Sequence, residues 1–508
     1  MSLAKVYSAS VVGLDAEPIE VEVDISSGKI GLTIVGLPDR VVEESKERVR
    51  SAIKNSDANF PMKRITVNLA PADVRKEGPV FDLAIAIGIL AASKQVEYDF
   101  SDSLFLGELA LEGKLRSITG ILPVCEMAIK KGYRKIFLPK ANIAEAMILK
   151  GVEIFAVESL AELIKHFNGE DQIISQSSGG FFDENQEMVF QYDFAHIKGQ
   201  DQAKRALEIV AAGGHNILMN GPPGSGKTLL ARSLPSILPR MTIEEMLEVT
   251  KIHSVAGILP NDEALIRMRP FRSPHHTSSA VSIVGGGVYP KPGEISLAHR
   301  GILFLDELPE FPRIVLEVLR QPLEDGVVNV SRASGAVCFP AKFILVAAQN
   351  PCPCGYLTDP TKQCTCSATT IARYQKKISG PLLDRIDLHI EVPRVEYSKL
   401  AVQDLAESSA SVRERVQRAR EIQQERFSNS KKTIFCNSEM GSEEISQFCI
   451  LDEGAKQLIK NAVTQMHLSA RVYHRILKIS RTIADLDNSE NILQKHIAEA
   501  LQYRIREK

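Results

Sequence analysis

The chain has 508 residues, of which 61 are basic and 63 acidic, so its formal net charge is −2. At roughly 150 residues per domain, this length corresponds to about three domains. The composition is 44% hydrophobic and 24% charged, as in ordinary globular proteins. These values exclude a minimal module, a wholly disordered chain and an overall basic coat, so any contact with nucleic acid must come from local basic patches.

The longest apolar stretch, residues 83–92, is about half as long as the ~20 residues that a membrane span needs. Residues 1–20 reach acidic side chains before they build the apolar core of a signal peptide. We therefore expect a cytoplasmic protein without membrane association. Eight cysteines in such a chain indicate reduced thiols or metal ligands rather than a disulfide framework.

Composition and periodicity divide the chain into four parts. Residues 1–168 alternate strand-like and helical runs, which predicts a mixed α/β domain. Residues 169–191 are polar, acidic and rich in Ser, Gly and Gln, which predicts a linker. Residues 192–393 alternate helices and buried strands, as in a parallel sheet wrapped by helices. Residues 394–508 have a helical pattern throughout, so the predicted fold class is α/β with an all-helical carboxy-terminal region.

The most specific motif is GPPGSGKT, which fits G-x-x-x-x-G-K-[ST] and lies between an apolar run and a helical one. In such a loop the glycines let backbone N–H groups point toward phosphate, Lys227 reaches the β- and γ-phosphates of ATP, and Thr228 binds Mg²⁺. The alternative is a turn that matches by chance. The predicted nucleotide-binding residues are Gly221, Pro222, Pro223, Gly224, Ser225, Gly226, Lys227, Thr228 and Leu229.

The second half of the site is predicted in GILFLDE, where two acids follow an apolar strand. Asp306 is placed to hold the magnesium ion, and Glu307 to orient or deprotonate the attacking water. Without the first motif, two such acids would be only the solvated end of a strand. The long separation between Lys227 and Asp306 predicts an insertion, which we place near residues 252–300.

Together with these motifs, the segments RPFRSPHHTSSAVSIVGGG, LVAAQNPCPCG and GPLLDRIDLHIEVP resemble the Mg-chelatase-like AAA+ ATPases. With its amino-terminal region the chain is most similar to the ComM/YifB family, and the resemblance covers nearly the whole sequence. It implies a P-loop AAA+ parallel-sheet core with inserts, a helical lid of the Mg-chelatase type and a homohexameric ring.

The same resemblance implies three further catalytic residues. Asn350 corresponds to the polar residue that senses the γ-phosphate, Arg385 to the arginine finger and Arg471 to the second sensor at the start of a lid helix. An always-charged guanidinium fork suits the last two roles because it can neutralise developing charge on phosphate. On spacing alone, Arg385 would be read as a member of surface salt bridges.

Four cysteines form two Cys-x-Cys pairs within an insertion at residues 350–368. They are Cys352, Cys354, Cys364 and Cys366. Four thiolates at this spacing suit a structural, tetrahedral Zn²⁺ ion, and free or redox-active thiols are the alternative. The adjacent His275 and His276 point in different directions on any regular element, so we expect phosphate or backbone contacts from them rather than a ligand pair.

Residues 66–139 resemble the Lon-type protease domain, a ribosomal S5 domain 2-like α/β fold. That family uses a Ser-Lys dyad. Here Val80 stands at the serine position and Leu122 at the lysine position, so both the nucleophile and the base are missing, and we expect a scaffold or binding role. The basic residues that would meet phosphates there, or form a solvated face instead, are Arg64, Arg75 and Lys76.

Two segments are candidates for gripping a substrate in the channel of a ring. Residues 328–338 alternate apolar and polar side chains around a small-residue turn, which predicts a hairpin with Arg332 near its tip. The second candidate is the insertion at residues 269–292. Its basic residues are Arg269, Arg272 and Lys291. Such residues suit sequence-independent contacts with DNA phosphates, whereas the absence of Trp argues against recognition dominated by base stacking.

Two functions compete for this sequence. The ComM/YifB resemblance implies a DNA motor, a helicase that drives branch migration of recombination intermediates during natural transformation, with single-stranded or branched DNA as its partner. The alternative is a chelatase-type motor for Mg²⁺ insertion into a porphyrin, or another protein-remodelling role. Chelatase motors of the related family lack the Lon-like domain, so the extra domain favours DNA. The expected cofactors are ATP, Mg²⁺ and structural Zn²⁺.

Overall fold

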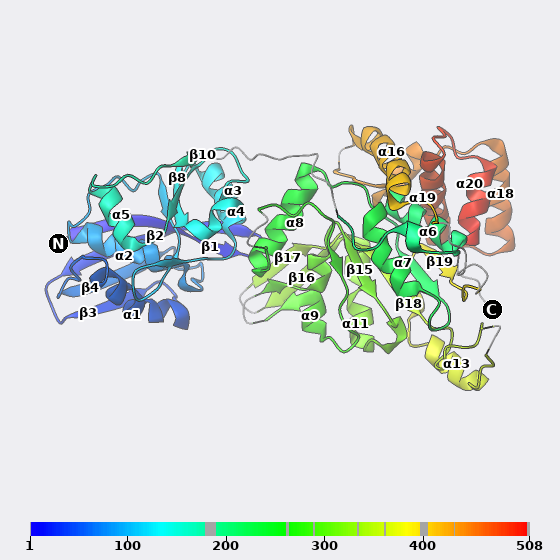
Figure 1. Cartoon of the computed structure of the whole chain (residues 1–508), viewed down its shortest axis with the longest axis horizontal. Coiled ribbons are helices and arrows are strands. Elements are labelled where there is room, and N and C mark those ends of the chain that lie inside the picture. The colour runs from blue at the N-terminus through cyan, green and yellow to red at the C-terminus, as the bar shows by residue number, and fades with distance from the viewer. Residues whose placement is uncertain are drawn as a thin grey trace. The chain divides into compact units, whose positions relative to one another are not determined.

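The computed structural model describes residues 2–177, 189–260, 264–287, 290–332, 335–359, 362–396, 405–430 and 432–504. The chain divides into two compact units (Figure 1). The first comprises Met1–Gln186 and Met246–Ile266, and the second Glu187–Glu245 and Arg267–Lys508. The predicted α/β class is confirmed, and no described helix is long and apolar enough to cross a membrane.

The first unit is built on an eight-stranded mixed sheet with the order β10-β9-β8-β5-β1-β2-β4-β3. Its strands are β1 (Ser2–Val12), β2 (Asp15–Ser26), β3 (Gly31–Val35), β4 (Arg64–Ala70), β5 (Ser103–Phe105), β8 (Lys135–Pro139), β9 (Glu153–Val157) and β10 (Gln176–Ser177). β1 and β2 form a long antiparallel hairpin, whereas β5, β8 and β9 are parallel. The short strands β6 (Glu108–Leu109) and β7 (Leu115–Arg116) pair with each other beside this sheet.

The helices of this unit are α1 (Arg40–Lys54), α2 (Asp82–Ala92), α3 (Ile121–Lys131), α4 (Ile143–Ala146) and α5 (Leu160–Phe167). The apolar stretch at residues 83–92 forms most of α2, which is buried on nearly every side. Gly88 lets this helix approach the sheet, because a Cβ there would lie 2.6 Å from Cγ2 of Val23. The stretch is therefore a buried core helix, which agrees with a length too short for a membrane span.

The positions that a Lon-type dyad would use carry only apolar side chains. Val80 lies in a short 3₁₀ turn (Pro79–Phe81), and Leu122 lies in the first turn of α3 and is 3% exposed. Lys76 fits neither alternative given for these basic residues, a phosphate contact or a solvated face, since its side chain is fully buried and its ammonium donates to the carbonyl of Pro71. Burial lowers the pKa of Lys76, so a phosphate contact there would require the side chain to leave the core.

The segment Met246–Ile266 packs within the first unit although it follows the P-loop in sequence. It includes most of α8 (Ile243–Ala256). Lys251 pairs with Glu126 at 2.7 Å, and Leu265 packs in a small cluster with Leu122. The insertion predicted near residues 252–300 is thus divided between the two units, because its first part buries apolar side chains against the amino-terminal fold.

The second unit is built on a parallel sheet with the order β12-β15-β18-β11-β19. Its strands are β11 (Ile217–Asn220), β12 (Phe271–Arg272), β15 (Ile302–Leu305), β18 (Ile344–Gln349) and β19 (Leu388–Glu391). Two antiparallel pairs accompany the sheet: β13 (Gly285–Gly286) with β14 (Lys291–Pro292), and β16 (Val327–Arg332) with β17 (Gly335–Pro340). The central strands are apolar and buried on both faces, as a helix-covered parallel sheet requires.

The helices around the sheet are α6 (Asp201–Gly213), α7 (Lys227–Ser233), α9 (Ala280–Val284), α10 (Glu294–Leu297), α11 (Arg313–Val318), α12 (Arg320–Asp325), α13 (Ala368–Gln375) and α14 (Gly380–Leu383). The helical lid follows with α16 (Ser409–Phe427), α17 (Ser442–Phe448), α18 (Glu453–Gln465), α19 (Ala470–Leu486) and α20 (Gln494–Gln502). Figure 1 shows α16 and α19 beside α6. Arg420 and Gln423 of α16 fasten this contact by donating to the carbonyls of Ala211 and Ala212.

Candidate nucleotide site

Three neighbouring strands of the parallel sheet end at the residues that the sequence singled out. β11 leads into Gly221, β15 into Asp306 and β18 into Asn350. The register pairs Asn220 with Gln349, so the first and third strands end level with each other. Because the carboxyl ends of parallel strands share one edge of a sheet, residues far apart in sequence meet there, which is where α/β sheets bind ligands.

The loop between β11 and α7 takes a backbone path that its glycines permit. Gly224 has φ 75° and Gly226 has φ 90°, both in the left-handed region that favours glycine. At Gly221 the restriction is space, since a Cβ there would lie 2.2 Å from the carbonyl oxygen of Val392. The loop therefore keeps backbone groups, rather than side chains, toward the position of a bound phosphate.

Lys227 lies inside this loop. Its ammonium donates to the carbonyls of Gly221 at 2.7 Å and Pro222 at 2.9 Å, and lies 3.3 Å from Oδ1 of Asn350. Burial lowers the pKa of Lys227. Since a triphosphate would supply the negative charge that these neutral carbonyls lack, the ammonium is placed to exchange loop carbonyls for phosphate oxygens.

The two acids after β15 have different environments. Asp306 accepts a hydrogen bond of 2.9 Å from the hydroxyl of Thr228, so the hydroxyl and the carboxylate predicted to hold Mg²⁺ are adjacent. These are hard oxygen donors of the kind that magnesium prefers. Glu307 has φ 53° and a side chain that is 54% exposed. Its carboxylate is therefore open to water at the same edge of the sheet.

His276 is a neighbour of Glu307 that the sequence did not assign to catalysis. Its Nδ1 lies 3.7 Å from Oε2 of Glu307, and its ring stacks near that of His275, with centroids 4.0 Å apart. The expectation of a phosphate or backbone contact did not include this pairing. No spacing in the sequence signals it, because the two segments come together only through the pairing of β12 with β15.

The four predicted zinc ligands lie together. The Sγ atom of Cys352 is 3.3 Å from that of Cys354 and 3.7 Å from that of Cys364, and all four sulfur atoms lie within 4.8 Å of one another. With Zn–S bonds of about 2.3 Å, the edges of a ZnS₄ tetrahedron are about 3.8 Å long. The sulfur atoms thus already have nearly the separations that one tetrahedral metal ion would impose.

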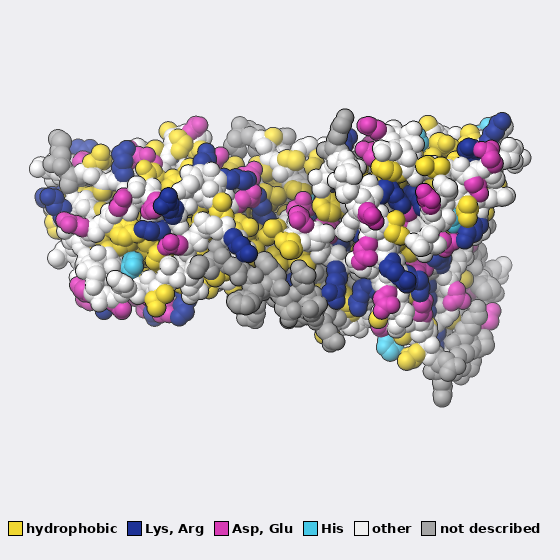
Figure 2. Space-filling model, turned by 90° about the horizontal axis from the view of Figure 1, so that it is seen from above, with side chains coloured by type: hydrophobic (Ala, Val, Ile, Leu, Met, Phe, Trp, Pro, Cys, Tyr) yellow, Lys and Arg dark blue, Asp and Glu magenta, His cyan; other side chains and the backbone are white. Residues whose placement is uncertain are grey.

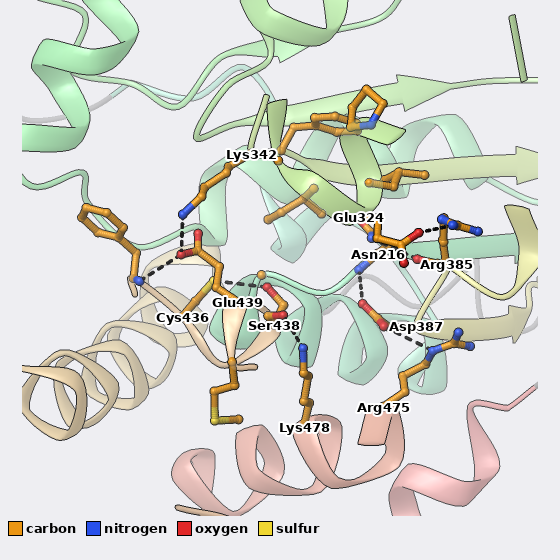
Figure 3. A pocket seen from close by; sticks show the side chains of 18 of the residues that line it. Asn216, Glu324, Lys342, Arg385, Asp387, Cys436, Ser438, Glu439, Arg475 and Lys478 are labelled. Carbon is orange, nitrogen blue, oxygen red and sulfur yellow. Dashed lines mark hydrogen bonds and ion pairs between the residues drawn. The ribbon is translucent and has the colours of Figure 1, made fainter. Parts of the chain in front are cut away.

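Arg385 and Arg471 lie near the amino ends of the strands of the same sheet, opposite to the P-loop. They line a cavity of about 750 Å³. Figure 3 shows Arg385 in it together with Asn216, which precedes β11, and Asp387, which precedes β19. Glu324, on α12, accepts hydrogen bonds from both guanidinium groups. Basic side chains outnumber acidic ones in the cavity lining, so this edge is suited to an anionic group.

The length of the strands separates this cavity from the P-loop, because the cavity lies at their amino ends and the P-loop at their carboxyl ends. β11 has four residues, which at about 3.3 Å per residue span roughly 13 Å. Arg385 precedes β19, and Arg471, on α19 (Ala470–Leu486), shares Glu324 with it, whereas Lys227, Asp306 and Asn350 follow the strands. Neither arginine is therefore placed to contact phosphate bound in the P-loop of its own chain.

The candidate DNA contacts differ in availability. Arg269 is wrong as a phosphate contact, because its side chain is 9% exposed and its guanidinium pairs with Glu245 at 2.7 Å. Arg272 is one-third exposed and pairs with Glu294 through two bonds of 2.7 Å, which leaves it little capacity for phosphate. Lys291, on β14, is exposed. Of the three predicted basic contacts of the insertion, Lys291 is the one with an exposed side chain.

The predicted hairpin at residues 328–338 is formed by β16 and β17. Arg332 is the last residue of β16 and pairs with Gly335, so its backbone lies next to the turn. Its side chain lies outside the described part of the structure. On the face drawn in Figure 2, basic and acidic side chains are interspersed, as the balanced net charge leads one to expect.

Comparisons with known proteins find similarity to one group of proteins over 99% of the chain. Three family models match: "Magnesium chelatase, subunit ChlI" at residues 193–400, "Subunit ChlI of Mg-chelatase" at residues 21–142, and "Magnesium chelatase, subunit ChlI C-terminal" at residues 406–504. The chain is 46% identical to Competence protein ComM of Haemophilus influenzae, over 99% of this chain and 98% of that protein. It is 44% identical to YifB of Escherichia coli, over 99% and 97% respectively. It is 23% identical to Magnesium-chelatase subunit ChlI of Nephroselmis olivacea, over 42% of this chain and 60% of that protein.

Proposed function

The chain belongs to the ComM/YifB family of Mg-chelatase-like AAA+ proteins, and from this premise we propose that it is an ATP-hydrolysing motor that acts on DNA. We propose specifically a cytoplasmic homohexameric helicase that drives branch migration of recombination intermediates during natural transformation. The observation that supports the motor most strongly is the meeting of Lys227, Thr228, Asp306, Glu307 and Asn350 at one edge of the sheet.

Each of these side chains has a role in hydrolysis that its position supports. Lys227 binds the β- and γ-phosphate oxygens, and Asn350 orients the γ-phosphate from the next strand. Glu307, exposed beside this site, takes a proton from the attacking water. Thr228 and Asp306 would hold Mg²⁺, which when bound neutralises charge on the phosphates.

The placement of the two arginines supports a ring. Arg385 and Arg471 lie at the end of the strands opposite to their own P-loop. They can therefore act in catalysis only on nucleotide bound by a neighbouring subunit. The excess of basic side chains in the cavity that they line suits a triphosphate from such a neighbour. A head-to-tail contact of this kind closes into a ring when every subunit repeats it.

The comparisons support a competence-related role over a chelatase role, and for that role we propose DNA as the substrate. The similarity to Competence protein ComM extends over 99% of this chain, whereas that to a chelatase subunit extends over 42%. The β16–β17 hairpin, with Arg332 next to its turn, and the exposed Lys291 are the elements that we assign to phosphate contact. Contacts with phosphate do not depend on the base sequence of the DNA, as a branch-migration motor requires.

Zinc is the proposed third cofactor. Four sulfur atoms that already approach the separations of a tetrahedral site support one structural Zn²⁺ ion per chain. Bound there, the ion would join the two Cys-x-Cys pairs and stabilise residues 350–368. Elemental analysis of protein purified without chelator tests this assignment, and metal-free, fully stable protein would refute it.

The substrate is tested by the ATPase rate of the full chain with no addition, with single-stranded DNA, with forked DNA, and with protoporphyrin IX. We expect forked and single-stranded DNA to raise the rate and protoporphyrin to leave it unchanged. Equal rates under all four conditions would contradict a DNA motor. Stimulation by protoporphyrin alone would favour the chelatase-type alternative.

A further inference from the structure

The cysteine cluster lies directly against the nucleotide site. Gly355 follows Cys354, and a Cβ at Gly355 would lie 2.6 Å from Cδ of Pro223 and 3.8 Å from Cγ of Asn350. Pro223 is a residue of the P-loop, and Asn350 lies within hydrogen-bonding distance of Lys227. The first cysteine turn therefore packs against both the phosphate-binding loop and the side chain that senses the γ-phosphate.

A second connection runs along the backbone. Asn350 comes immediately after β18, and Cys352, which is fully buried, follows it by two residues. The carbonyl of Pro351, between them, accepts a hydrogen bond of 3.4 Å from Gln375 on α13. Because the interior is close-packed, a change in the position of Cys352 must be shared by Asn350. The cluster and the nucleotide site thus touch through Gly355 and are joined covalently through Asn350.

Without a metal ion, contacts between thiols would join the four cysteine side chains to one another, and thiol hydrogen bonds are weak. A metal ion would replace these contacts with four strong bonds and fix the turn that carries Gly355.

From these contacts we infer that metal binding at the four cysteines and nucleotide binding at the P-loop are energetically coupled. Zn²⁺ in the cluster holds Pro223 and Asn350 in the arrangement that binds nucleotide and so raises the affinity for it. The inference rests on the proposed zinc and nucleotide sites. Coupling between two binding sites is reciprocal, so nucleotide raises the affinity for zinc by the same factor.

The effect of zinc on nucleotide affinity and the effect of nucleotide on zinc affinity are measured separately on the full chain. The first measurement is the Kd of a fluorescent ADP analogue for zinc-loaded protein and for protein whose zinc a chelator has removed. The second is the Kd for Zn²⁺, from competition with a chromophoric chelator, with and without saturating ADP. Allosteric coupling typically changes affinities by roughly 5- to 150-fold. We expect about a tenfold weakening of ADP binding without zinc and an equal weakening of zinc binding without ADP.

Gly355→Ala tests the contact without removing a metal ligand. The added methyl group meets Pro223, so we expect zinc to remain bound while ADP binds more weakly and no longer alters the affinity for zinc. Gly132→Ala is the matched control, because Gly132 has φ 85° against 82° for Gly355 and its Cβ would meet nothing within 4 Å. Cys338→Ser controls for loss of an exposed thiol outside the cluster.

The outcomes separate this inference from the function on which it rests. Protein that binds ADP but no zinc refutes the zinc site and the coupling together. Protein that binds both, with each affinity independent of the other ligand, refutes the coupling alone and leaves both sites standing. The coupling is supported if zinc and ADP change each other's affinity by the same factor, and if this effect is lost in Gly355→Ala and kept in Gly132→Ala. If removal of zinc unfolds the protein, the Gly355→Ala comparison decides.

Discussion

The hydroxyl of Thr228 donates a hydrogen bond of 2.9 Å to the carboxylate of Asp306, across 78 positions of sequence. This bond joins the helix after the P-loop to the end of β15, and both oxygens are predicted magnesium ligands. If both are ligands, a bound ion would lie close to this pair.

Asp306→Asn should therefore reduce Mg²⁺-dependent ATP hydrolysis by roughly 10²-fold or more, because several kcal/mol of charge stabilisation depends on the metal. The steady-state ATPase rate as a function of Mg²⁺ concentration checks this. Glu310→Gln, an exposed acid nearby that pairs with Lys377, is the control and should keep the wild-type rate. A wild-type dependence on Mg²⁺ in Asp306→Asn would show that this carboxylate does not hold the ion.

Lys227→Ala and Glu307→Gln should separate binding from hydrolysis. Lys227 is the cation that the P-loop places at the phosphates, so its loss should abolish nucleotide binding or turnover. Glu307→Gln should bind ATP yet hydrolyse it slowly, since the amide cannot accept a proton from water. Binding of a fluorescent ATP analogue and single-turnover hydrolysis distinguish the two variants. Normal turnover in either variant would contradict its assigned role.

Arg385→Ala should leave ATP affinity nearly intact and lower the rate of hydrolysis by roughly 10³-fold or more, as loss of an arginine finger does. The exposed Arg418 of α16 donates to its own helix, and Arg418→Ala should behave as wild type. Mixtures of Arg385→Ala with Glu307→Gln subunits test action across subunits. Partial recovery of activity would support it, whereas no recovery at any ratio would contradict a shared site.

Burial of His389 on β19 predicts a loss of stability in mild acid. Burial, with the neighbouring Arg475, lowers its pKa to about 4, whereas an unfolded chain has a histidine pKa of about 6.5. Between these values the unfolded chain binds more protons, so stability falls as the pH drops through this range and is unaffected above it. Removing the histidine should reduce that slope by up to about 1.4 kcal/mol per pH unit. Urea unfolding of wild type and His389→Asn at pH 5, 6 and 7 checks this, and equal slopes would contradict it.

More of the nucleotide site than of the rest of the protein could be predicted from the sequence. The loop glycines, Lys227 and the acids after β15 could be predicted because short motifs encode the backbone path and the donors themselves. The pairing of Glu307 with His276 could not be predicted, because the two residues come close only when β12 and β15 lie side by side in the sheet. Arg269 was misassigned because composition shows a basic loop but not the buried Glu245 that neutralises it. The burial of Lys76, which contradicts both alternatives given for it, could not be predicted for a similar reason, since burial is a property of the packed fold.

DNA translocation is tested most directly by strand displacement. A forked duplex with one labelled strand is incubated with wild-type protein, with Glu307→Gln and with Arg332→Ala, in the presence and absence of ATP. We predict that wild type releases the labelled strand only with ATP, that Glu307→Gln binds the fork without releasing it, and that Arg332→Ala keeps its basal ATPase but releases less strand. Wild-type protein that hydrolyses ATP at the same rate with and without the fork, and never displaces the strand, would contradict a DNA motor.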